Sequence, residues 1–530
     1  MRKNIQILDC TLRDGGYVND WAFGHNVITS IYRRLDTAGV EYIEVGFLDE
    51  RRPEDLNRSI FPNTAALDRV YAGVEKKQAI PVAMIDFGTC SIDNIAPASE
   101  SFIDGIRVIF KKEKIAQALP FCRAIKDKGY KLFIQAISIT AYTDAEMLEY
   151  VEQINEIKPF AFSIVDTYGL LNNKTMARYF YLIDNNLDKD ISIGYHEHNN
   201  FQLGFSNTLK FIGKDSDRLL VADSTVYGMG KSAGNCPTEL LAMQLNAEYG
   251  KNYNLSEILE IIDTNVMPIY MKHFWGYKLD FYISAMQACH PNYVQFLLQK
   301  KTLSISSIND ILSSIPTDKK LLYDKFWIEN AYTQYQSNEI NDYATVRFFE
   351  KMLVGKKRIM LIGPGTSYHG YVKMYKKSND DAVIGVNFAP KDIMCDAVFI
   401  SNAKRYTQFV DGTDRGKNKQ PVVLTSNISP IAGEPCMLLN YASLVYPDER
   451  CKDNSLLLIL RCLVSLGVKS VELVGFDGFR QSGPNYFEEG LSFNNLNIID
   501  YNNIISRALT QMSKEIEIHF VTSTQYVISK

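Results

Sequence analysis

The chain has 530 residues, 46% of them hydrophobic, and its 57 basic and 61 acidic side chains leave a net charge of −4. This length exceeds one ordinary domain and predicts two to four, and the absence of excess positive charge argues against a nucleic-acid partner. Nine cysteines without a CxxC pair argue against a zinc knuckle and a disulfide framework, and they fit a reducing cytoplasm.

Neither the start of the chain nor its longest apolar run predicts a membrane segment. Residues 1–6 lack the apolar core of a signal peptide. The run from Ser455 to Val468 is interrupted by Arg461 and is too short to span a bilayer, so it predicts a buried helix. We therefore expect a cytoplasmic protein without a membrane partner.

The first 240 residues alternate short apolar runs with longer helical patterns. Eight runs have the length of strands: Ile5–Asp9, Tyr42–Phe47, Ile80–Ile85, Gly105–Phe110, Lys131–Ile137, Phe162–Val165, Ile191–Tyr195 and Arg218–Val221. Eight strand–helix units in this length predict a (β/α)8 TIM barrel, with an open doubly wound sheet as the alternative.

Polar residues at the ends of these runs favour the barrel. Chemistry in such barrels gathers at the carboxyl ends of the strands. Those ends, or the segments just after them, carry Arg13, Asp14, Glu44, Asp86, Gln135, Asp166, His196, His198 and Asp223. Because a buried polar group is costly unless it is paired or used, these residues predict a site, with a purely structural network as the alternative for any one of them.

His196 and His198 are two of only seven histidines and stand two residues apart at the end of a predicted strand. Residues i and i+2 of a strand point to the same side, so the two imidazoles converge as a metal pair requires. The alternative is a pair of surface or hydrogen-bonded histidines.

The rest of the chain divides into a helical stretch and a second α/β domain. Residues 245–350 are rich in aromatic residues and helical in pattern, and charges near 351–358 mark a boundary. We therefore predict a barrel over 1–285, a helical extension and linker over 286–355, and a Rossmann-like α/β domain over 356–530.

The predicted Rossmann-like domain begins with a strand that ends in Gly363-Pro-Gly365. Gly363 and Gly365 would allow a phosphate to approach the backbone, and Asp477 stands at a later strand end where it could bind a metal or a ribose. The run is not GxGxxG and lacks the Lys-Ser/Thr of a P-loop, so nicotinamide binding is poorly supported. A structural domain without a ligand is the alternative.

Five motifs of the first 240 residues occur in a characteristic order. They are Cys10-Thr-Leu-Arg-Asp-Gly15, Ile43-Glu-Val-Gly46, Asp166-Thr-Tyr-Gly169, His196-Glu-His-Asn-Asn200 and Gly228-Met-Gly-Lys-Ser-Ala-Gly-Asn235. Together they resemble the DRE-TIM metallolyase family, which includes 4-hydroxy-2-oxovalerate aldolase, hydroxymethylglutaryl-CoA lyase and isopropylmalate synthase. The resemblance covers about residues 3–300.

The resemblance and the residue types imply a divalent-metal aldolase of 2-oxo acids. Asp14, His196 and His198 would bind the metal, with Asn235 as a further ligand or a plain turn residue. We expect Mn²⁺ or Mg²⁺, with Co²⁺ or Zn²⁺ as alternatives. Arg13 would stabilise the pyruvate enolate that remains after carbon–carbon cleavage releases an aldehyde, and Glu44 completes the catalytic candidates.

The catalytic base departs from the family pattern. Aldolases of the family carry a histidine shortly after Arg-Asp-Gly and the Claisen synthases carry Glu-Gln, whereas this chain has Gly16 and Tyr17. Tyr17 is then either a base whose pKa is lowered by the metal and Arg13 or a group that only orients substrate. His25 and His290 are the other candidates.

Two rival functions stay open for the barrel, and the second domain has a resemblance of its own. A Claisen-type acyl-CoA/2-oxo acid synthase is one rival, and a non-enzymatic scaffold on a decayed barrel is the other. The runs 362–367, 386–388 and 396–399 together resemble in part Rossmann-like sialyltransferase and pterin-pyrophosphokinase-like domains. That resemblance implies a nucleotide or nucleotide-sugar ligand, and a role in making sugars of surface polysaccharides is an analogy at the level of the fold. We also expect a homo-oligomer.

Overall fold

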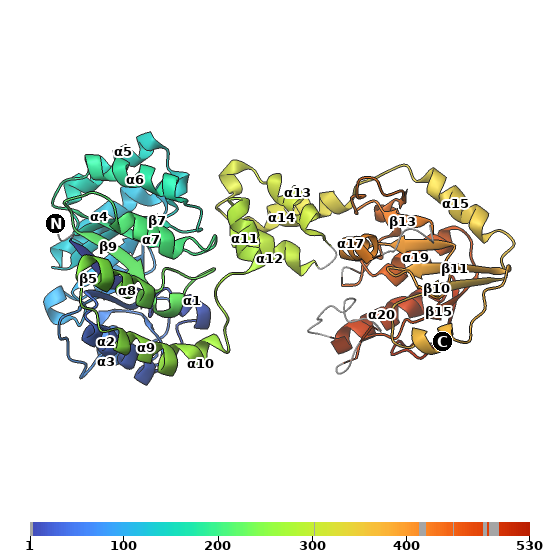
Figure 1. Cartoon of the computed structure of the whole chain (residues 1–530), viewed down its shortest axis with the longest axis horizontal. Helices are drawn as coiled ribbons and strands as arrows, with labels where there is room; N and C mark the ends of the chain where they lie inside the picture. The colour runs from blue at the N-terminus through green and yellow to red at the C-terminus, as the bar shows by residue number, and fades with distance from the viewer. Residues whose placement is uncertain are drawn as a thin grey trace. The chain divides into compact units, whose positions relative to one another are not determined.

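The computed structural model describes residues 4–300, 303–412, 420–448, 450–480, 485–486 and 498–529. Contacts divide the chain into two compact units, Met1–Pro291 and Asn292–Lys530. Each unit is described by itself (Figure 1). Among the helices of the described residues, none has the length and apolarity needed to cross a membrane.

The first unit is a closed barrel of parallel strands. Its order is β1-β9-β8-β7-β6-β5-β4-β2, and β1 also pairs with β2, which closes the ring and excludes the open sheet. The short β3 (Ile60–Phe61) pairs with the carboxyl end of β2. The barrel strands are β1 (Ile5–Asp9), β2 (Tyr42–Leu48), β4 (Ile80–Asp86), β5 (Gly105–Ile109), β6 (Lys131–Ala136), β7 (Ala161–Asp166), β8 (Ser192–Glu197) and β9 (Leu220–Ser224).

Helices follow seven of the eight strands. They are α2 (His25–Ala38), α3 (Thr64–Val70), α4 (Ile115–Asp127), α5 (Asp144–Ile157), α6 (Asn173–Asn186), α7 (Gly204–Ile212) and α8 (Thr238–Tyr249). After β4 the chain makes only two 3₁₀ turns, η1 (Ile92–Asn94) and η2 (Ala98–Glu100). The unit continues through α9 (Leu255–Ile261), α10 (Met267–Tyr270) and α11 (Leu279–Met286).

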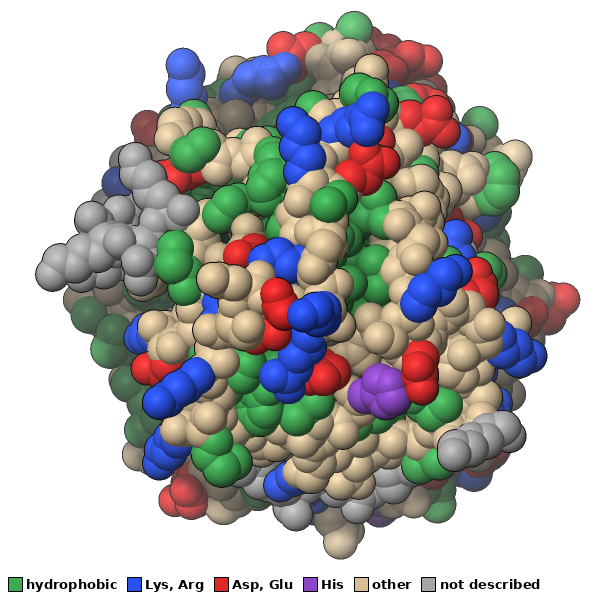
Figure 2. Space-filling model, turned by 90° about the vertical axis from the view of Figure 1, so that its right-hand side faces the viewer, with side chains coloured by type: hydrophobic (Ala, Val, Ile, Leu, Met, Phe, Trp, Pro, Cys, Tyr) green, Lys and Arg blue, Asp and Glu red, His purple; other side chains and the backbone are tan. Residues whose placement is uncertain are grey.

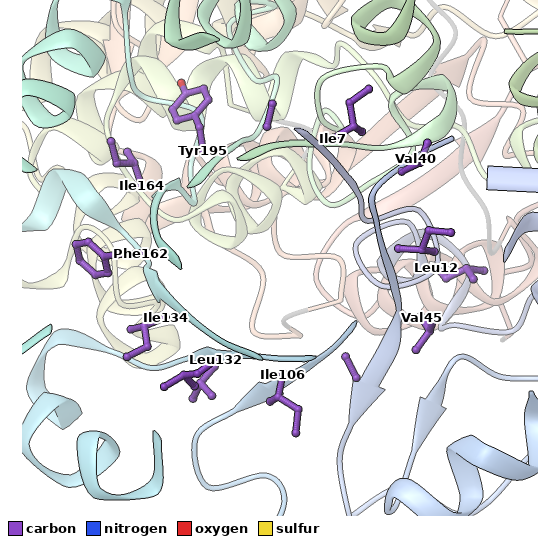
Figure 3. Packing of buried hydrophobic residues seen from close by; sticks show 14 of the residues in the cluster. Ile7, Leu12, Val40, Val45, Ile106, Leu132, Ile134, Phe162, Ile164 and Tyr195 are labelled. Carbon is purple, nitrogen blue, oxygen red and sulfur yellow. The ribbon is translucent and has the colours of Figure 1, made fainter. Parts of the chain in front are cut away.

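The main core of the barrel unit lies between the strands and the helices. Alternate strand residues such as Ile106, Ile134 and Ile164 point outward from the ring of strands (Figure 3). On the helices, apolar residues at helical spacing face them, as Met147, Val151 and Ile154 do on α5, all fully buried. Each such buried side chain contributes about 1.5–3 kcal/mol.

Inside the ring, the side chains form two layers of opposite character. The lower layer is apolar and contains Leu8, Tyr42, Val82, Phe133, Ala161 and Val221. On four of these strands the residue two positions further along is polar and also buried: Glu44, Gln135, Ser163 and Asp223. Arg107 on β5 and His196 on β8 belong to the same polar layer, and glycines occupy the positions two residues before them. The strand period of two therefore stacks a charged layer on an apolar one, towards the carboxyl ends of the strands.

The second unit contains a parallel sheet of order β14-β13-β12-β11-β10-β15-β16. Its strands are β10 (Arg358–Ile362), β11 (Asp381–Val386), β12 (Ala397–Ile400), β13 (Val422–Thr425), β14 (Met437–Leu439), β15 (Ser470–Val474) and β16 (Glu517–Phe520). The order reverses between β10 and β15, the arrangement of a doubly wound Rossmann-like domain. Its helices are α16 (Tyr368–Val372), α17 (Ala403–Gly412), α18 (Tyr441–Leu444), α19 (Ser455–Ser465) and α20 (Ile498–Met512).

Helices between the barrel and this sheet belong to the second unit by their contacts. They are α12 (Pro291–Gln299), which begins at the boundary, α13 (Ile305–Ser313), α14 (Lys325–Gln336) and α15 (Tyr343–Leu353). Phe349 of α15 is fully buried in the core that α19 and β11 share, and Asp342 accepts a hydrogen bond from the Asn440 amide at 2.8 Å. The helical stretch predicted over 286–355 therefore contributes to the core of the second unit.

The face of the molecule in Figure 2 carries Lys and Arg side chains interspersed with Asp and Glu. On this face the two signs of charge are mixed, without the concentrated positive field that would attract a phosphate backbone.

Candidate metal centre and active site

Arg107 is the centre of the charged layer inside the barrel. Its guanidinium donates to Glu44 at 2.9 Å and Gln135 at 3.1 Å, and it also pairs with Asp223. The side chain is fully buried, so each of these bonds offsets part of a large desolvation cost. We did not predict a role for Arg107 from the sequence, although an arginine within the apolar run Gly105–Ile109 is the signal that could have identified it.

Three potential metal ligands converge above this layer. Asp14 follows β1, His196 lies at the end of β8 and His198 directly follows that strand. Their ligand atoms lie within 4.8 Å of one another, all three side chains are buried, and the two imidazole centroids are 5.3 Å apart. One carboxylate and two imidazoles in a cluster are a donor set for a divalent cation.

Two buried atoms at this cluster have no hydrogen-bond partner within the described part of the chain: Nδ1 of His198 and Oδ1 of Asn235. Buried polar atoms are seldom left in this state, and both are electron-pair donors if His198 is neutral. Asn235 also donates from Nδ2 to Asp14 at 2.6 Å, which holds its side chain beside the carboxylate. These residues therefore fit a bound cation.

Protonation favours the same interpretation. Burial lowers the pKa of His198 to about 3, and the charges of Lys231 and Arg13 act in the same direction. Burial alone would raise the pKa of Asp14, but Arg13 and the two histidines outweigh it and hold that pKa well below its usual range. At neutral pH the cluster thus presents a carboxylate and a neutral imidazole, which are the protonation states that ligate metals.

His196 is oriented by a carboxylate behind it. Its Nδ1 lies 3.0 Å from Asp223, which leaves Nε2 available as the ligand atom. Cys10, His196 and Asp223 form a second group with ligand spacing. This group fits a cation less well, because burial raises the pKa of the Cys10 thiol and Asp223 is already paired with Arg107.

The loop after β9 covers the cluster closely. Its residue Gly230 is so near that a Cβ there would lie 2.1 Å from Asn235 Nδ2 and 2.5 Å from Asp14 Oδ2. The backbone amide of Lys231 donates to Asp14 at 3.1 Å. The glycine-rich sequence 228–235 is therefore explained by the close approach of its backbone to the candidate ligands.

Arg13 bridges the cluster and the charged layer. Its Nη1 donates to Asp14 at 2.5 Å and its Nε donates to Glu44 at 2.7 Å, and the side chain is 6% exposed. Both carboxylates raise the pKa of Arg13 against the opposing effect of burial, so the group stays charged. Nε and Nη1 are thus both engaged by carboxylates of the protein.

The three candidate bases lie in different surroundings. Burial raises the pKa of Tyr17 to about 12, and nearby carboxylates add to the effect while Arg13 opposes it. The imidazole of His25 lies 2.9 Å from the Val70 carbonyl, between α2 and α3, away from the cluster. His290 lies 6.0 Å from the ring of Tyr168, in the segment after β7, and burial lowers its pKa to about 4.

The glycines of the second unit have structural partners. The amides of Gly363 and Gly365 donate to Val474 and Gly475, both at 2.8 Å. A Cβ on Gly475, whose φ is +70°, would lie 2.3 Å from the Gly363 carbonyl oxygen, so the segments that follow the neighbouring strands β10 and β15 approach each other too closely for a side chain. These two amides are used within the protein and do not face a phosphate.

Asp477 joins the segment that follows β15 to the segment that follows β10. Its carboxylate accepts from the Thr366 hydroxyl at 2.9 Å, from the Ser367 amide at 2.8 Å and from the Ser367 hydroxyl. The side chain is 4% exposed. The strand-end position predicted from the sequence is therefore present, with its oxygens engaged by the neighbouring turn.

A cavity of about 400 Å³ lies where the strand order reverses in this sheet. Its lining includes Gly365, Asn387, Arg405, Arg450, Phe476 and Tyr486. The guanidinium of Arg405 stands 5.1 Å from the ring centroid of Tyr486. Open α/β sheets bind ligands at this reversal point, outside the carboxyl ends of the strands.

Comparisons with known proteins match the barrel. The sequence model of the family described as HMGL-like matches residues 4–264. The oxaloacetate decarboxylase of Mycobacterium tuberculosis is 26% identical over 45% of this chain and 69% of its own length. The 4-hydroxy-2-oxovalerate aldolase of Bacillus cereus is 25% identical over 51% of this chain and 79% of its own.

Two further known proteins are similar to about half of this chain. A probable 2-isopropylmalate synthase of Methanosarcina acetivorans is 28% identical, and the match spans 48% of each chain. The crystal structure of the HMG-CoA lyase of Brucella melitensis superposes on 49% of this chain and 96% of its own, with 16% identity and a TM-score of 0.39.

Proposed function

Because residues 4–264 form an HMGL-like domain of the DRE-TIM metallolyase type, we propose that the chain is a divalent-metal-dependent aldolase that cleaves a 2-oxo acid through a pyruvate enolate. The observation that carries this proposal is the cluster of Asp14, His196 and His198 with the unpartnered Oδ1 of Asn235 beside it. The resemblance to an aldolase and an oxaloacetate decarboxylase supports it, since cleavage by either enzyme leaves the same three-carbon enolate.

The chemistry divides between the cation and the chain. A divalent ion held by Asp14, His196, His198 and Asn235 would supply a Lewis acid for the keto group of the substrate. Arg13 would donate from Nη2 to the oxygen on which charge develops as the bond beyond C3 breaks. Its other nitrogens are fixed by Asp14 and Glu44, so this donor is already oriented before the reaction.

We assign the proton transfer of the cleavage step to His290. The hydroxyl group beyond C3 must lose a proton as the aldehyde forms. With a pKa of about 4, His290 is neutral at pH 7 and can accept that proton, whereas Tyr17 would first have to ionise at a pKa of about 12. Tyr17 then orients substrate through its ring, which packs 4.8 Å from that of Trp21.

Deuterium exchange into C3 of pyruvate, followed by NMR, tests the proposal without knowledge of the aldehyde. Exchange should require a divalent ion, and His290→Asn should slow the cleavage of a 4-hydroxy-2-oxo acid about 10²–10⁴-fold while Tyr17→Phe retains most of the rate. A protein with bound metal that shows no exchange contradicts the proposal.

A condensing activity is the second candidate, favoured by the resemblance to a probable isopropylmalate synthase. A Claisen synthase would condense an acyl-CoA with a 2-oxo acid and release free CoA. Thiol release from acetyl-CoA in the presence of 2-oxo acids would identify this reaction, and the aldolase proposal expects none.

For the second unit we propose a phosphorylated ligand, most simply a nucleotide or nucleotide sugar. The support is the cavity of about 400 Å³ at the reversal of the sheet, with the basic side chains of Arg405 and Arg450 and the rings of Phe476 and Tyr486 in its lining. Because the amides of Gly363 and Gly365 are engaged, the phosphate would meet the basic side chains. A chain with both activities would serve the synthesis of an acidic sugar for a surface polysaccharide.

Saturation-transfer NMR of the full chain with nucleoside mono-, di- and triphosphates tests this second site. The expected result is that at least one nucleotide binds and that Arg405→Gln weakens this binding. Neither the nucleotide nor the substitution should change the rate of pyruvate exchange. No binding by a folded protein would favour a purely structural second unit.

A further inference from the structure

One cation at the candidate active site is not used by the proposed reaction. Lys231 is half-buried in the loop after β9, and its backbone amide is held by Asp14 at 3.1 Å. The backbone of the preceding residue, Gly230, also lies close to the Asp14 carboxylate. The base of the Lys231 side chain is thus fixed at the edge of the metal cluster.

The ammonium group of Lys231 has no carboxylate within ion-pair distance anywhere in the described ranges. Its Nζ stands 5.3 Å from the ring centroid of Tyr17, which itself borders the cluster. Arg13 differs, since it is bracketed by Asp14 and Glu44 at 2.5 and 2.7 Å. Withdrawing an ammonium from water without a counter-ion is unfavourable, and such a group is ready to receive an anion.

A second lysine acts at the same place. Lys111 follows β5, is exposed, and has no ion pair to any residue that the structure describes. The charges of Lys231 and Lys111 both lower the pKa of His290, so both lysines lie within electrostatic range of that histidine. Asp14 and Asp86 are the opposing charges near Lys231, but Arg13 pairs with Asp14 at 2.5 Å, and Lys114, Arg51 and Lys111 all act on Asp86.

We infer that Lys231 binds an anionic group on the aldehyde portion of the substrate, so that the acceptor is a carboxylated or phosphorylated aldehyde and not a simple neutral one. The inference rests on the proposed aldolase function and adds a substrate class to it. Lys111, at the outer rim, would add attraction at longer range. A charge-assisted hydrogen bond of this kind corresponds to a preference of about ten- to a hundred-fold for the charged aldehyde.

Binding of matched aldehydes to the full chain, measured by NMR titration in the presence of Mg²⁺, tests the inference without turnover. One pair is 4-oxobutanoate and butanal, and the other is glyceraldehyde 3-phosphate and glyceraldehyde. The wild type should bind the charged member of at least one pair about tenfold more tightly. The pair that shows the preference identifies whether carboxylate or phosphate carries it.

Variants assign the preference to Lys231. Lys231→Met should make the charged and neutral members bind alike, and Lys231→Arg should retain most of the preference. Lys112→Met is the matched control, because Lys112 lies on the same rim but is paired with Glu146 at 2.5 Å, and it should leave the preference unchanged.

Three results would overturn the inference: equal binding of charged and neutral aldehydes by the wild type, a preference that survives Lys231→Met, or a loss on Lys231→Met that is confined to pyruvate. The last would place the lysine on the 2-oxo acid. Failure of the proposed function is a separate result, since it appears as absent pyruvate exchange in the wild type whatever the aldehydes do.

Discussion

Polar residues gather at the carboxyl ends of parallel strands in both units, but they differ in how far the protein satisfies them. In the barrel, Nδ1 of His198 and Oδ1 of Asn235 are buried without partners in the described structure. Beyond the carboxyl ends of the neighbouring strands β10 and β15, the Asp477 carboxylate accepts three hydrogen bonds from Thr366 and Ser367. The first arrangement leaves two electron-pair donors unsatisfied, whereas the second is complete within the protein.

The comparison teaches that the position of a polar residue at a strand end does not by itself identify a ligand site. Gly363, Gly365 and Asp477 occupy the positions that a nucleotide fold uses, yet their amides and oxygens bond to each other's turns. Satisfied groups predict an effect on stability when they are removed. Unsatisfied groups predict an effect on binding.

The largest expected effect is at the metal cluster. Combined His196→Ala and His198→Ala should abolish binding of a divalent cation and with it pyruvate exchange, because two of the three clustered ligands are removed. Metal titration by calorimetry would check the binding and circular dichroism would check the fold. Binding of the cation by the double variant as tightly as by the wild type would place the metal elsewhere.

The opposite behaviour is expected at Asp477. Asp477→Ala should lower the free energy of unfolding of the second unit by about 2–4 kcal/mol, because it removes hydrogen bonds to a charged acceptor and leaves buried donors unsatisfied. Calorimetric unfolding would show a lower transition temperature for this unit with pyruvate exchange unchanged. If stability is kept and nucleotide binding is lost instead, Asp477 is a ligand group and the contrast between the units fails.

The next prediction concerns Arg13, which donates hydrogen bonds to both Asp14 and Glu44. Arg13→Ala should reduce pyruvate exchange about 10²–10³-fold with the cation still bound, since it removes one donor to the developing charge. The measurement is exchange at saturating metal, with metal affinity determined on the same sample. An unchanged rate would assign Arg13 to a structural role between Asp14 and Glu44.

A smaller effect is expected from Asp9, on the outer face of β1. Burial raises the pKa of Asp9 from 3.8 to about 6, although hydrogen bonds from Thr238 and Thr11 oppose the rise. The folded state therefore holds a proton that the unfolded state has released between these pH values, and this stabilising contribution is lost as pH rises through about 6.

Asp9→Asn removes that titration. Relative to the variant, the wild type should lose on the order of 2 kcal/mol of stability between pH 4.5 and pH 7.5. Urea unfolding of both proteins at the two pH values measures the difference. A difference that does not change with pH would mean that the carboxyl of Asp9 keeps its ordinary pKa when folded.

The sequence predicted the barrel well because strand period and strand-end polarity are local signals. The strand Ile5–Asp9 was predicted to the residue, and the pairing of β1 with both β9 and β2 confirmed the closed ring. In the second domain, apolar runs of the sequence predict the strands β10, β11, β12, β13 and β15. No run predicts the edge strands, because β14 has only three residues and β16 is half exposed with little apolar pattern.

Parts of the site that depend on distant contacts were harder to predict. The same-side arrangement of His196 and His198 follows from their spacing, but the partners of Arg107 lie on other strands and only the closed ring brings them together. The contacts that engage Gly363 and Asp477 were equally hard to predict, since they join residues about 110 positions apart along the chain. Local sequence shows which groups are polar, whereas the fold decides which of them are left unsatisfied.

The most direct test of the account is the incorporation of deuterium at C3 of pyruvate by the full chain, measured by NMR with a divalent ion and after its removal by a chelator. The account predicts exchange that depends on the ion, returns when the ion is restored and is absent from the His196→Ala/His198→Ala variant. Exchange of equal rate with and without the ion, or none from folded protein that binds the ion, would contradict it.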